Sequence, residues 1–174
     1  MAIYILEAAN LFCGADDESS SKHLTIRDLK LPTLEEKTVE LHPGGSMFAV
    51  QIGALGFNAL AATFRLVGFD PAMLRLFGLS SVLTRRYTAY GVVRDKISGQ
   101  PKQVKAIMDG RLQRMEPDAF NRGEVRGDSY NISEIMHYEL WFDRAEEFFF
   151  DFPTISWRVG GVDQNDERQL LGLT

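Results

Sequence analysis

The stretch that decides the fold is TVELHPGGSMFAVQI, which runs from Thr38 to Ile52. Apolar and polar residues alternate on both sides of a Pro43-Gly44-Gly45 turn, and this period-two pattern predicts two strands of a β-hairpin. The apolar residues fall on one face of each strand, namely Val39, Leu41, Phe48, Val50 and Ile52. Including its flanks, the predicted hairpin spans residues 34–56, and it has one apolar side.

An isolated two-stranded hairpin is only marginally stable in water, so something should cover this apolar face. Each of its apolar side chains would gain roughly 1.5–3 kcal/mol on full burial. The hairpin therefore either folds back on its own domain or projects and packs on a neighbouring copy. Gly44 and Gly45 at the tip, with Gly53 and Gly56 at the base, suggest a jointed arm and favour projection.

The composition predicts a structured protein of one domain spanning residues 1–174. A hydrophobic fraction of 45% is enough to build a core, and a net charge of −5 argues against a surface that grips phosphates. The single cysteine, Cys13, excludes an internal disulfide. The first residues lack the basic segment of a signal peptide, and no apolar run approaches the roughly 18 residues of a membrane span.

The pattern along the chain predicts a mainly β fold, an antiparallel β-barrel or sandwich with a protruding hairpin. Strands are expected within residues 24–32, 57–68, 83–97, 104–115, 131–143 and 147–159. One short helix is expected at 70–78, because Asp70 suits the N-cap, Pro71 the first turn and Gly78 the stop. Its inward stripe should be Met73, Leu74 and Phe77, and a second short helix is expected at 163–171.

The residues give no positive support for an enzyme. His23, His42 and His137 show no metal-ligand spacing, and no phosphate-binding glycine loop or nucleophile motif is present. Cys13 is interpreted as a structural thiol. No catalytic, cofactor or metal site is predicted.

The strand at 104–115 has two contrasting faces. Val104, Ala106, Met108 and Leu112 share the apolar face, and the opposite polar face carries Lys105, Asp109, Arg111 and Gln113. Basic residues also cluster along the hairpin that contains this strand, namely Arg85, Arg86, Arg94, Lys96, Lys102 and Lys105. We interpret this cluster as a solvated strand face balanced by nearby acids, with a patch for another subunit's acidic surface as the alternative.

Three segments together resemble the major tail tube proteins of contractile-tailed bacteriophages, which are related to the tubes of phage-tail-like bacteriocins and contractile injection systems. The first is LKLPTLEEKTVELHPGGSMFAVQIGALGFNALAATFRLVG, with its LP strand and glycine-tipped hairpin. The second is the strand pair YTAYGVVRDKISGQPKQVKAIMDGRLQRMEP. The third is FDFPTISWRVGGVDQNDERQLLGL, with a GVD turn and a final LGL. The acidic, serine-rich loop at 14–23 departs from this pattern.

The resemblance implies a structural subunit that assembles into hexameric rings, stacked as the inner tube of a contractile tail that conducts DNA. The hairpin would then be an inter-ring contact, and the polar face at Lys105, Asp109, Arg111 and Gln113 is one candidate for the lumen wall. The partners implied are further copies of the chain, the tail sheath, baseplate and terminator proteins, and a tape measure protein. DNA would pass without specific binding. The implied location is the virion tail, assembled in the host bacterial cytoplasm.

Two alternatives remain at this stage. The chain could be the tube of a phage-tail-like bacteriocin or type VI-like injection system without DNA cargo. From a different class of protein, it could be a monomeric β-barrel binding module that holds its hairpin over a ligand pocket.

Overall fold

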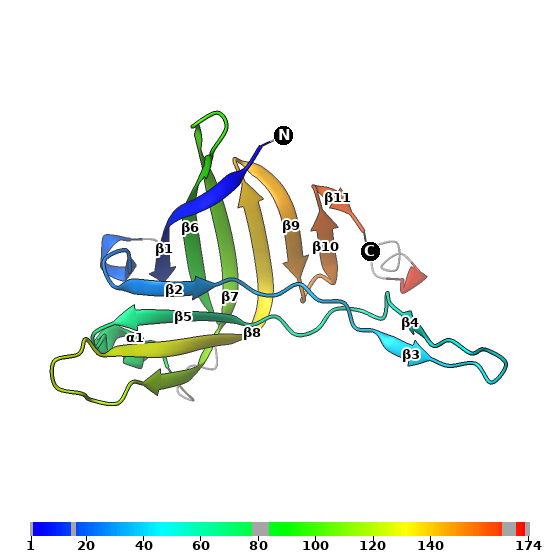
Figure 1. The fold of residues 1–174 in the computed structure, drawn as a ribbon, viewed down its shortest axis with the longest axis horizontal. Coiled ribbons are helices and arrows are strands. Elements are labelled where there is room, and N and C mark those ends of the chain that lie inside the picture. Colours follow the sequence, from blue (N-terminus) through cyan, green and yellow to red (C-terminus); the bar gives the residue numbers. More distant parts are fainter. Residues whose placement is uncertain (1, 15–16, 78–83, 165–169, 173–174) are drawn as a thin grey trace.

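The computed structural model describes residues 2–14, 17–77, 84–164 and 170–172. A nine-stranded antiparallel sheet makes up most of it, and a separate two-stranded sheet forms a projecting arm (Figure 1). The strands in the first half are β1 (Tyr4–Cys13), β2 (Ile26–Lys30), β3 (Val39–Leu41), β4 (Val50–Ile52) and β5 (Ala62–Val67). Those in the second half are β6 (Arg85–Asp95), β7 (Pro101–Pro117), β8 (Gly127–Phe142), β9 (Ala145–Asp151), β10 (Ser156–Val159) and β11 (Val162–Asp163).

The main sheet is bent rather than closed. Its principal order is β1-β6-β7-β8-β9-β10-β11, and β5 pairs with the first half of β8 while β2 pairs with β5. Figure 1 shows β2 and β5 crossing the foot of the upright strands at a steep angle. The prediction of a mainly antiparallel β fold with a short helix is confirmed, but the sheet does not close into a barrel, because β1 and β11 at its two ends do not pair.

The bend lies where β8 passes Gly110 of β7. Asp109 pairs with His137 whereas Arg111 pairs with Ser133, so β8 holds extra residues at this point and Glu134 takes a φ of 52°. Glycine is required at position 110, because a Cβ there would lie 2.9 Å from Ile132 Cγ2. This irregularity lets β8 pair with β5 in its first half and with β9 in its second.

The core fills the inside of the bend. The apolar face predicted on β7 is confirmed for Ala106, Met108 and Leu112, which are buried there, and Val104 at its start is half-buried. The three buried residues pack with buried side chains from both parts of the sheet, including Leu66 and Phe64 of β5, Tyr87 of β6, Tyr130, Ile132 and Tyr138 of β8, and Phe148 of β9.

The predicted mid-chain helix is present as α1 (Pro71–Leu76). Asp70 caps it as predicted, because its side chain accepts a hydrogen bond from the Ala72 N–H at 2.9 Å. Only Met73 of the predicted inward stripe is buried, and Leu74 and Phe77 are exposed. The prediction for these two was wrong because a helix of six residues presents too little of its surface to the core. Gly78, the predicted stop, lies outside the described residues.

The end of the chain differs from the prediction in two ways. The single strand expected at 147–159 is two strands, β9 and β10, separated by a turn in which Ile155 donates its N–H to Phe152 O and takes a φ of 49°. The helix expected at 163–171 cannot begin at Asp163, because Asp163 belongs to β11 and pairs with Arg158. Most of that expected helix, residues 165–169, lies outside the described residues.

The N-terminal strand β1 was not predicted. It pairs along β6, with a register shift between Leu6 and Ala8. The segment at 14–23 contains a short 3-10 helix, η1 (Glu18–Ser20), and Lys22 near its end is buried. The Lys22 ammonium lies 2.6 Å from the Asp70 carboxylate, so this segment is tied to the start of α1.

Candidate assembly surfaces

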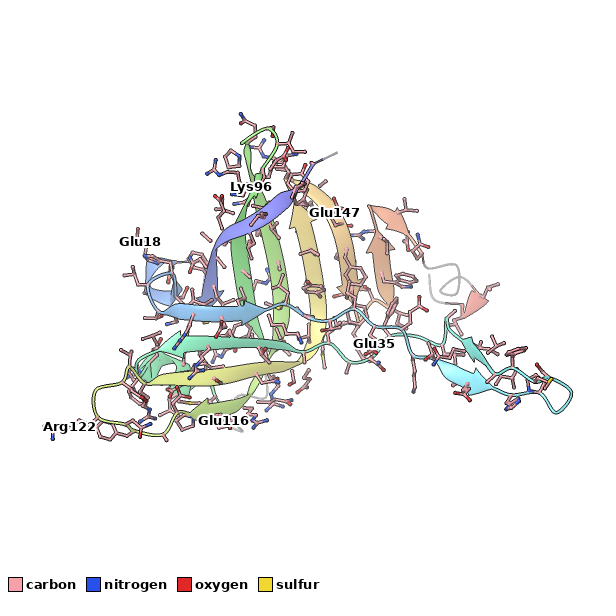
Figure 2. All side chains as sticks on the ribbon, viewed as in Figure 1. Glu18, Glu35, Lys96, Glu116, Arg122 and Glu147 are labelled. Carbon is pink, nitrogen blue, oxygen red and sulfur yellow. The ribbon has the colours of Figure 1, made fainter. Side chains whose placement is uncertain are left out.

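The arm formed by β3 and β4 is amphipathic and exposed on both faces. Val39 pairs with Ile52, and Leu41 pairs with Val50. Because directly opposed residues of an antiparallel pair point to the same side, these four apolar side chains share one face. All four are exposed, as are Met47 and Phe48 nearer the tip. The predicted hairpin therefore exists and projects, and no described part of the chain buries its apolar face (Figure 2).

The two segments at the base of the arm are hydrogen-bonded to each other, and we call this base the clasped root. Lys37 donates its N–H to Gly56 O at 2.8 Å, and Asn58 donates its N–H to Glu35 O at 2.9 Å. The Asn58 side chain also donates to the Glu35 carboxylate at 3.0 Å. These bonds hold residues 35–37 against 56–58, so the two segments of the arm pair again at its root. The joint expected from Gly53 and Gly56 stays a prediction.

The structure does not require glycine at either of the two tip positions, 44 and 45. Neither Gly44 nor Gly45 has a positive φ, and a Cβ at either position would meet no other atom within 4 Å. The turn itself is closed by the Ser46 N–H, which donates to Pro43 O at 3.0 Å. The role assigned to Gly44 and Gly45 in self-assembly therefore stays a prediction.

The polar face predicted on β7 lies on the side of the large sheet away from the core. Lys105, Asp109 and Arg111 are half-buried there, and Gln113 is exposed where the register with β8 shifts. Arg111 and Gln113 both donate to the Glu134 carboxylate, at 3.1 and 3.4 Å. The four predicted residues thus share one face of the sheet, and their lumen position stays a prediction.

Four of the six basic residues predicted to cluster on the β6–β7 hairpin are paired with acids, namely Arg86, Arg94, Lys96 and Lys102, and no ion pair is seen for Arg85 or Lys105 among the described residues. The Arg86 guanidinium makes two hydrogen bonds to Asp109, both of 2.9 Å. The remaining pairs of this kind are Arg94 and Lys96 with Glu7, and Lys102 with Asp143. Hydrogen bonds from Lys96 and Arg94 hold the pKa of Glu7 below its usual range. Lys105 has a different partner, because its ammonium lies 5.5 Å from the centre of the Tyr90 ring.

Similar pairs join the strands farther along the same face, on β8, β9 and β10. Arg158 of β10 makes two hydrogen bonds to Glu146 of β9, at 2.8 and 2.9 Å. This guanidinium lowers the pKa of Glu146. His137 of β8 lies between two carboxylates, 3.0 Å from Asp151 and 2.9 Å from Glu139. The outer face of the large sheet therefore carries a series of charge pairs between neighbouring strands.

Sequence reasoning missed the two open edges at the ends of the principal strand order. One edge is β1, which pairs with β6 and is bridged on its other side only near its end, where Phe12 pairs with Ser21. The other edge is the β10–β11 hairpin, and β2 beside β5 is a further terminal strand of the branched sheet. Both edges carry exposed apolar side chains, namely Ile3, Tyr4, Ile5 and Leu6 at the first and Val159 and Val162 at the second. An edge strand with unpaired N–H and C=O groups is a template for pairing with another chain. The run of apolar residues at 3–6 was the sequence feature from which the β1 edge could have been predicted.

Three features bear on metal binding, on the cysteine and on membrane spans. The described residues contain no group of three or more His, Cys, Asp and Glu side chains placed to hold a metal ion. Cys13 is buried, and burial raises the pKa of its thiol to about 12. No helix within these residues is long and apolar enough to cross a membrane.

The described residues thus form a bent antiparallel sheet with open edges and a projecting apolar arm. The chain belongs to the phage tail tube protein FII family, whose model matches residues 4–172. This finding confirms the resemblance drawn from the sequence. A search of individually curated protein sequences finds no match to this chain.

Two solved structures have a similar fold, and both come from an extracellular contractile injection system in its extended state. The first is described as the PVC sheath/tube terminator, with a TM-score of 0.51 at 8% sequence identity over 78% of this chain and 92% of that chain. The second is described as the PVC sheath-tube complex, with a TM-score of 0.52 at 8% identity over 77% of this chain and 88% of that chain. At this identity the likeness establishes the fold alone.

Proposed function

We propose that this chain is the repeating subunit of the inner tube of a contractile tail, forming hexameric rings that stack into a conduit for DNA delivery. The observation that carries the proposal is the coexistence of two open sheet edges and an uncovered apolar arm on one subunit. The sixfold number comes from the family resemblance.

The open edges account for ring formation. Within a ring, β1 of one copy would lie beside the β10–β11 edge of the next, so that the large sheets join into a continuous wall. Such a contact uses two different surfaces of the same chain, and a heterologous contact of this kind closes into a ring when its rotation closes. The exposed apolar residues at both edges would be buried by the same contact.

The arm accounts for stacking. The proposed self-assembly residues are Val39, Leu41, Gly44, Gly45, Phe48, Val50 and Ile52. Its apolar side chains are unburied in the single subunit and would be covered by a neighbouring ring. A contact along the axis that does not close produces a filament, here a tube of stacked rings.

The outer face of the large sheet is the proposed lumen wall, and it includes Lys105, Asp109, Arg111 and Gln113. A conduit for DNA must not hold phosphates, because each unpaired cation contributes to binding a polyanion. Arg86, Arg111 and Arg158 on this face are each paired with a carboxylate of the same chain. This pairing would let DNA slide past without being gripped.

The proposed partners follow from this position in the tail. They are further copies of the chain, the tail sheath protein outside, baseplate and terminator proteins at the two ends, and a tape measure protein in the lumen during assembly. The proposed location is the virion tail, assembled in the host bacterial cytoplasm. A headless particle or type VI-like system would use the same tube without DNA. By contrast, a monomeric binding module would hold its hairpin over a pocket, whereas this arm projects away from the sheet (Figure 1).

The test is negative-stain electron microscopy of the purified protein over a concentration series, with and without preformed baseplates. Rings with sixfold averages or tubes of uniform diameter are the expected result. A protein that stays monomeric at every concentration and does not add to baseplates would contradict the proposal.

A further inference from the structure

A half-enclosed apolar cavity of about 430 Å³ lies at the root of the arm. Its aromatic and aliphatic lining comes from the segment before β3, the segment before β5, the bend of β8, and β9 with the turn after it. The lining side chains used below are Leu34, Phe57, Ile135, Phe148, Phe150 and Phe152. Phe148 is buried at its floor, whereas Leu34, Phe57 and Phe152 are exposed. We call this cavity the root pocket.

The tip of the same arm carries two of the most exposed large apolar side chains among the described residues. Met47 is 93% exposed and Phe48 is 80% exposed. They are held on an ordered turn, because the Ser46 hydroxyl donates to Phe48 O at 2.9 Å and the Phe48 N–H donates to Ser46 Oγ at 3.1 Å. An aromatic side chain presented this way is the kind of anchor that dominates the binding energy of protein interfaces.

The tip cannot reach the root pocket of its own chain. Figure 1 shows the arm projecting away from the main sheet, and β8 and β9 of that sheet carry part of the pocket lining. The occupant that fits is therefore the tip of a second copy. An aromatic ring entering an aromatic-lined pocket also gains edge-to-face contacts of the kind that Phe57 and Trp157 make here, with ring centres 5.3 Å apart.

The charges of the two surfaces are compatible. Residues 41–48 contain no carboxylate and include His42. The root pocket has two carboxylates in or beside its lining, Glu134, which is paired with Arg111, and Glu35, which accepts from the Asn58 side chain (Figure 2). A carboxylate-free tip meets them without like-charge repulsion.

We infer that the root pocket of one subunit receives the Met47–Phe48 tip of a second copy. The inference rests on the proposed function, because it requires the chain to assemble with itself. Pocket and tip lie at opposite ends of one arm, so the contact is head-to-tail and each subunit both gives a tip and receives one. Every copy carries both a root pocket and a tip, so the contact can be repeated from copy to copy without limit.

The test is a cysteine pair, Phe48→Cys with Phe152→Cys, oxidised mildly under assembly conditions. Both positions are exposed in the single subunit, so the variant should fold, and native Cys13 is buried away from the reaction. The expected result is a ladder of disulfide-linked multimers on a non-reducing gel. The matched control is Phe48→Cys with Phe120→Cys, because Phe120 is 79% exposed but lies in the loop at the end of the molecule opposite the arm, near Arg122 (Figure 2). The control pair should give no ladder beyond dimers.

Three outcomes would overturn the inference. Tubes that form without a ladder would show that the tip sits elsewhere, and the proposed function would stand. Dimers alone would show a reciprocal contact rather than a head-to-tail one. A disulfide within one chain would show that the arm folds back on its own pocket. Failure of the proposed function itself is distinct, since electron microscopy would then reveal no rings or tubes in the protein without these substitutions.

Discussion

The bent sheet and the arm follow the same alternating sequence pattern but have opposite environments. On β5, alternate residues Ala62, Phe64 and Leu66 are buried in the core. On the arm, alternate residues Val50 and Ile52 are exposed. The comparison teaches that alternation defines which face of a strand is apolar, whereas the topology decides whether the same chain or another one covers that face.

The two regions also differ in what holds them together. The sheet is stabilised by a continuous apolar core, while the arm pairs only three residues of each strand and depends on the clasped root. Changes in the sheet should therefore lower the stability of the subunit, and changes in the arm should alter assembly alone.

The largest effect on stability is expected from Leu66→Ala in the core. Leu66 is fully buried, and truncation of such a side chain removes transfer free energy and leaves a cavity. We expect the free energy of unfolding to fall by about 3 kcal/mol. Urea unfolding followed by circular dichroism measures this change, and Val50→Ala on the arm is the matched control. A similar loss in both variants would contradict the distinction between the two regions.

A smaller loss is expected from Asp70→Asn. Asparagine keeps a helix-capping oxygen, but it removes the charge that pairs with Lys22, whose side chain is only 8% exposed. Leaving a buried ammonium unpaired should lower the free energy of unfolding by about 2 kcal/mol, because Asp70 itself keeps some contact with water. The control is Glu116→Gln, which breaks an exposed pair with Arg114 and should cost less than about 1 kcal/mol.

The Lys22–Asp70 pair also predicts a dependence on pH. Partial burial alone would raise the pKa of Asp70, but hydrogen bonds from Lys22, Ala72 and Met73 outweigh it, and the pKa lies below the ordinary value. The unfolded chain then binds more protons, so stability rises with pH. The contribution is complete above the unfolded pKa of about 3.9 and is lost as the pH falls through the lower folded-state pKa. As the pH is lowered through this range, the urea concentration at the unfolding midpoint should fall less steeply for Asp70→Asn than for the unchanged protein.

The lumen assignment can be sharpened by comparing a position on the outer face with an exposed position on another strand. Gln103, on the outer face of the large sheet, and Arg27, on β2, are both exposed, and each is replaced by cysteine. In the free subunit both thiols should react with a maleimide carried on a large globular protein. In assembled tubes we expect the Gln103→Cys thiol to be protected and the Arg27→Cys thiol to react. Equal reactivity of the two thiols in tubes would contradict a lumen position for this face.

Several elements could be predicted from the sequence because their signals are local. The cap at Asp70 and the apolar face of β7 at Ala106, Met108 and Leu112 are examples. The β1 strand was missed because the shift between Leu6 and Ala8 breaks the alternation on which the prediction depends. The open edges and the root pocket were missed for a different reason, since residues far apart in the sequence form them only after folding.

The most direct test of the central claim is the double substitution Phe48→Asp and Val50→Asp on the arm. It places two charges on the apolar face without touching the core, so the thermal midpoint of the subunit should stay unchanged. Electron microscopy should then find tubes of the unchanged protein and none of the variant. A variant that unfolds would place the arm in the subunit's own core, and a variant that still forms tubes would show that the arm's apolar face is not an assembly contact.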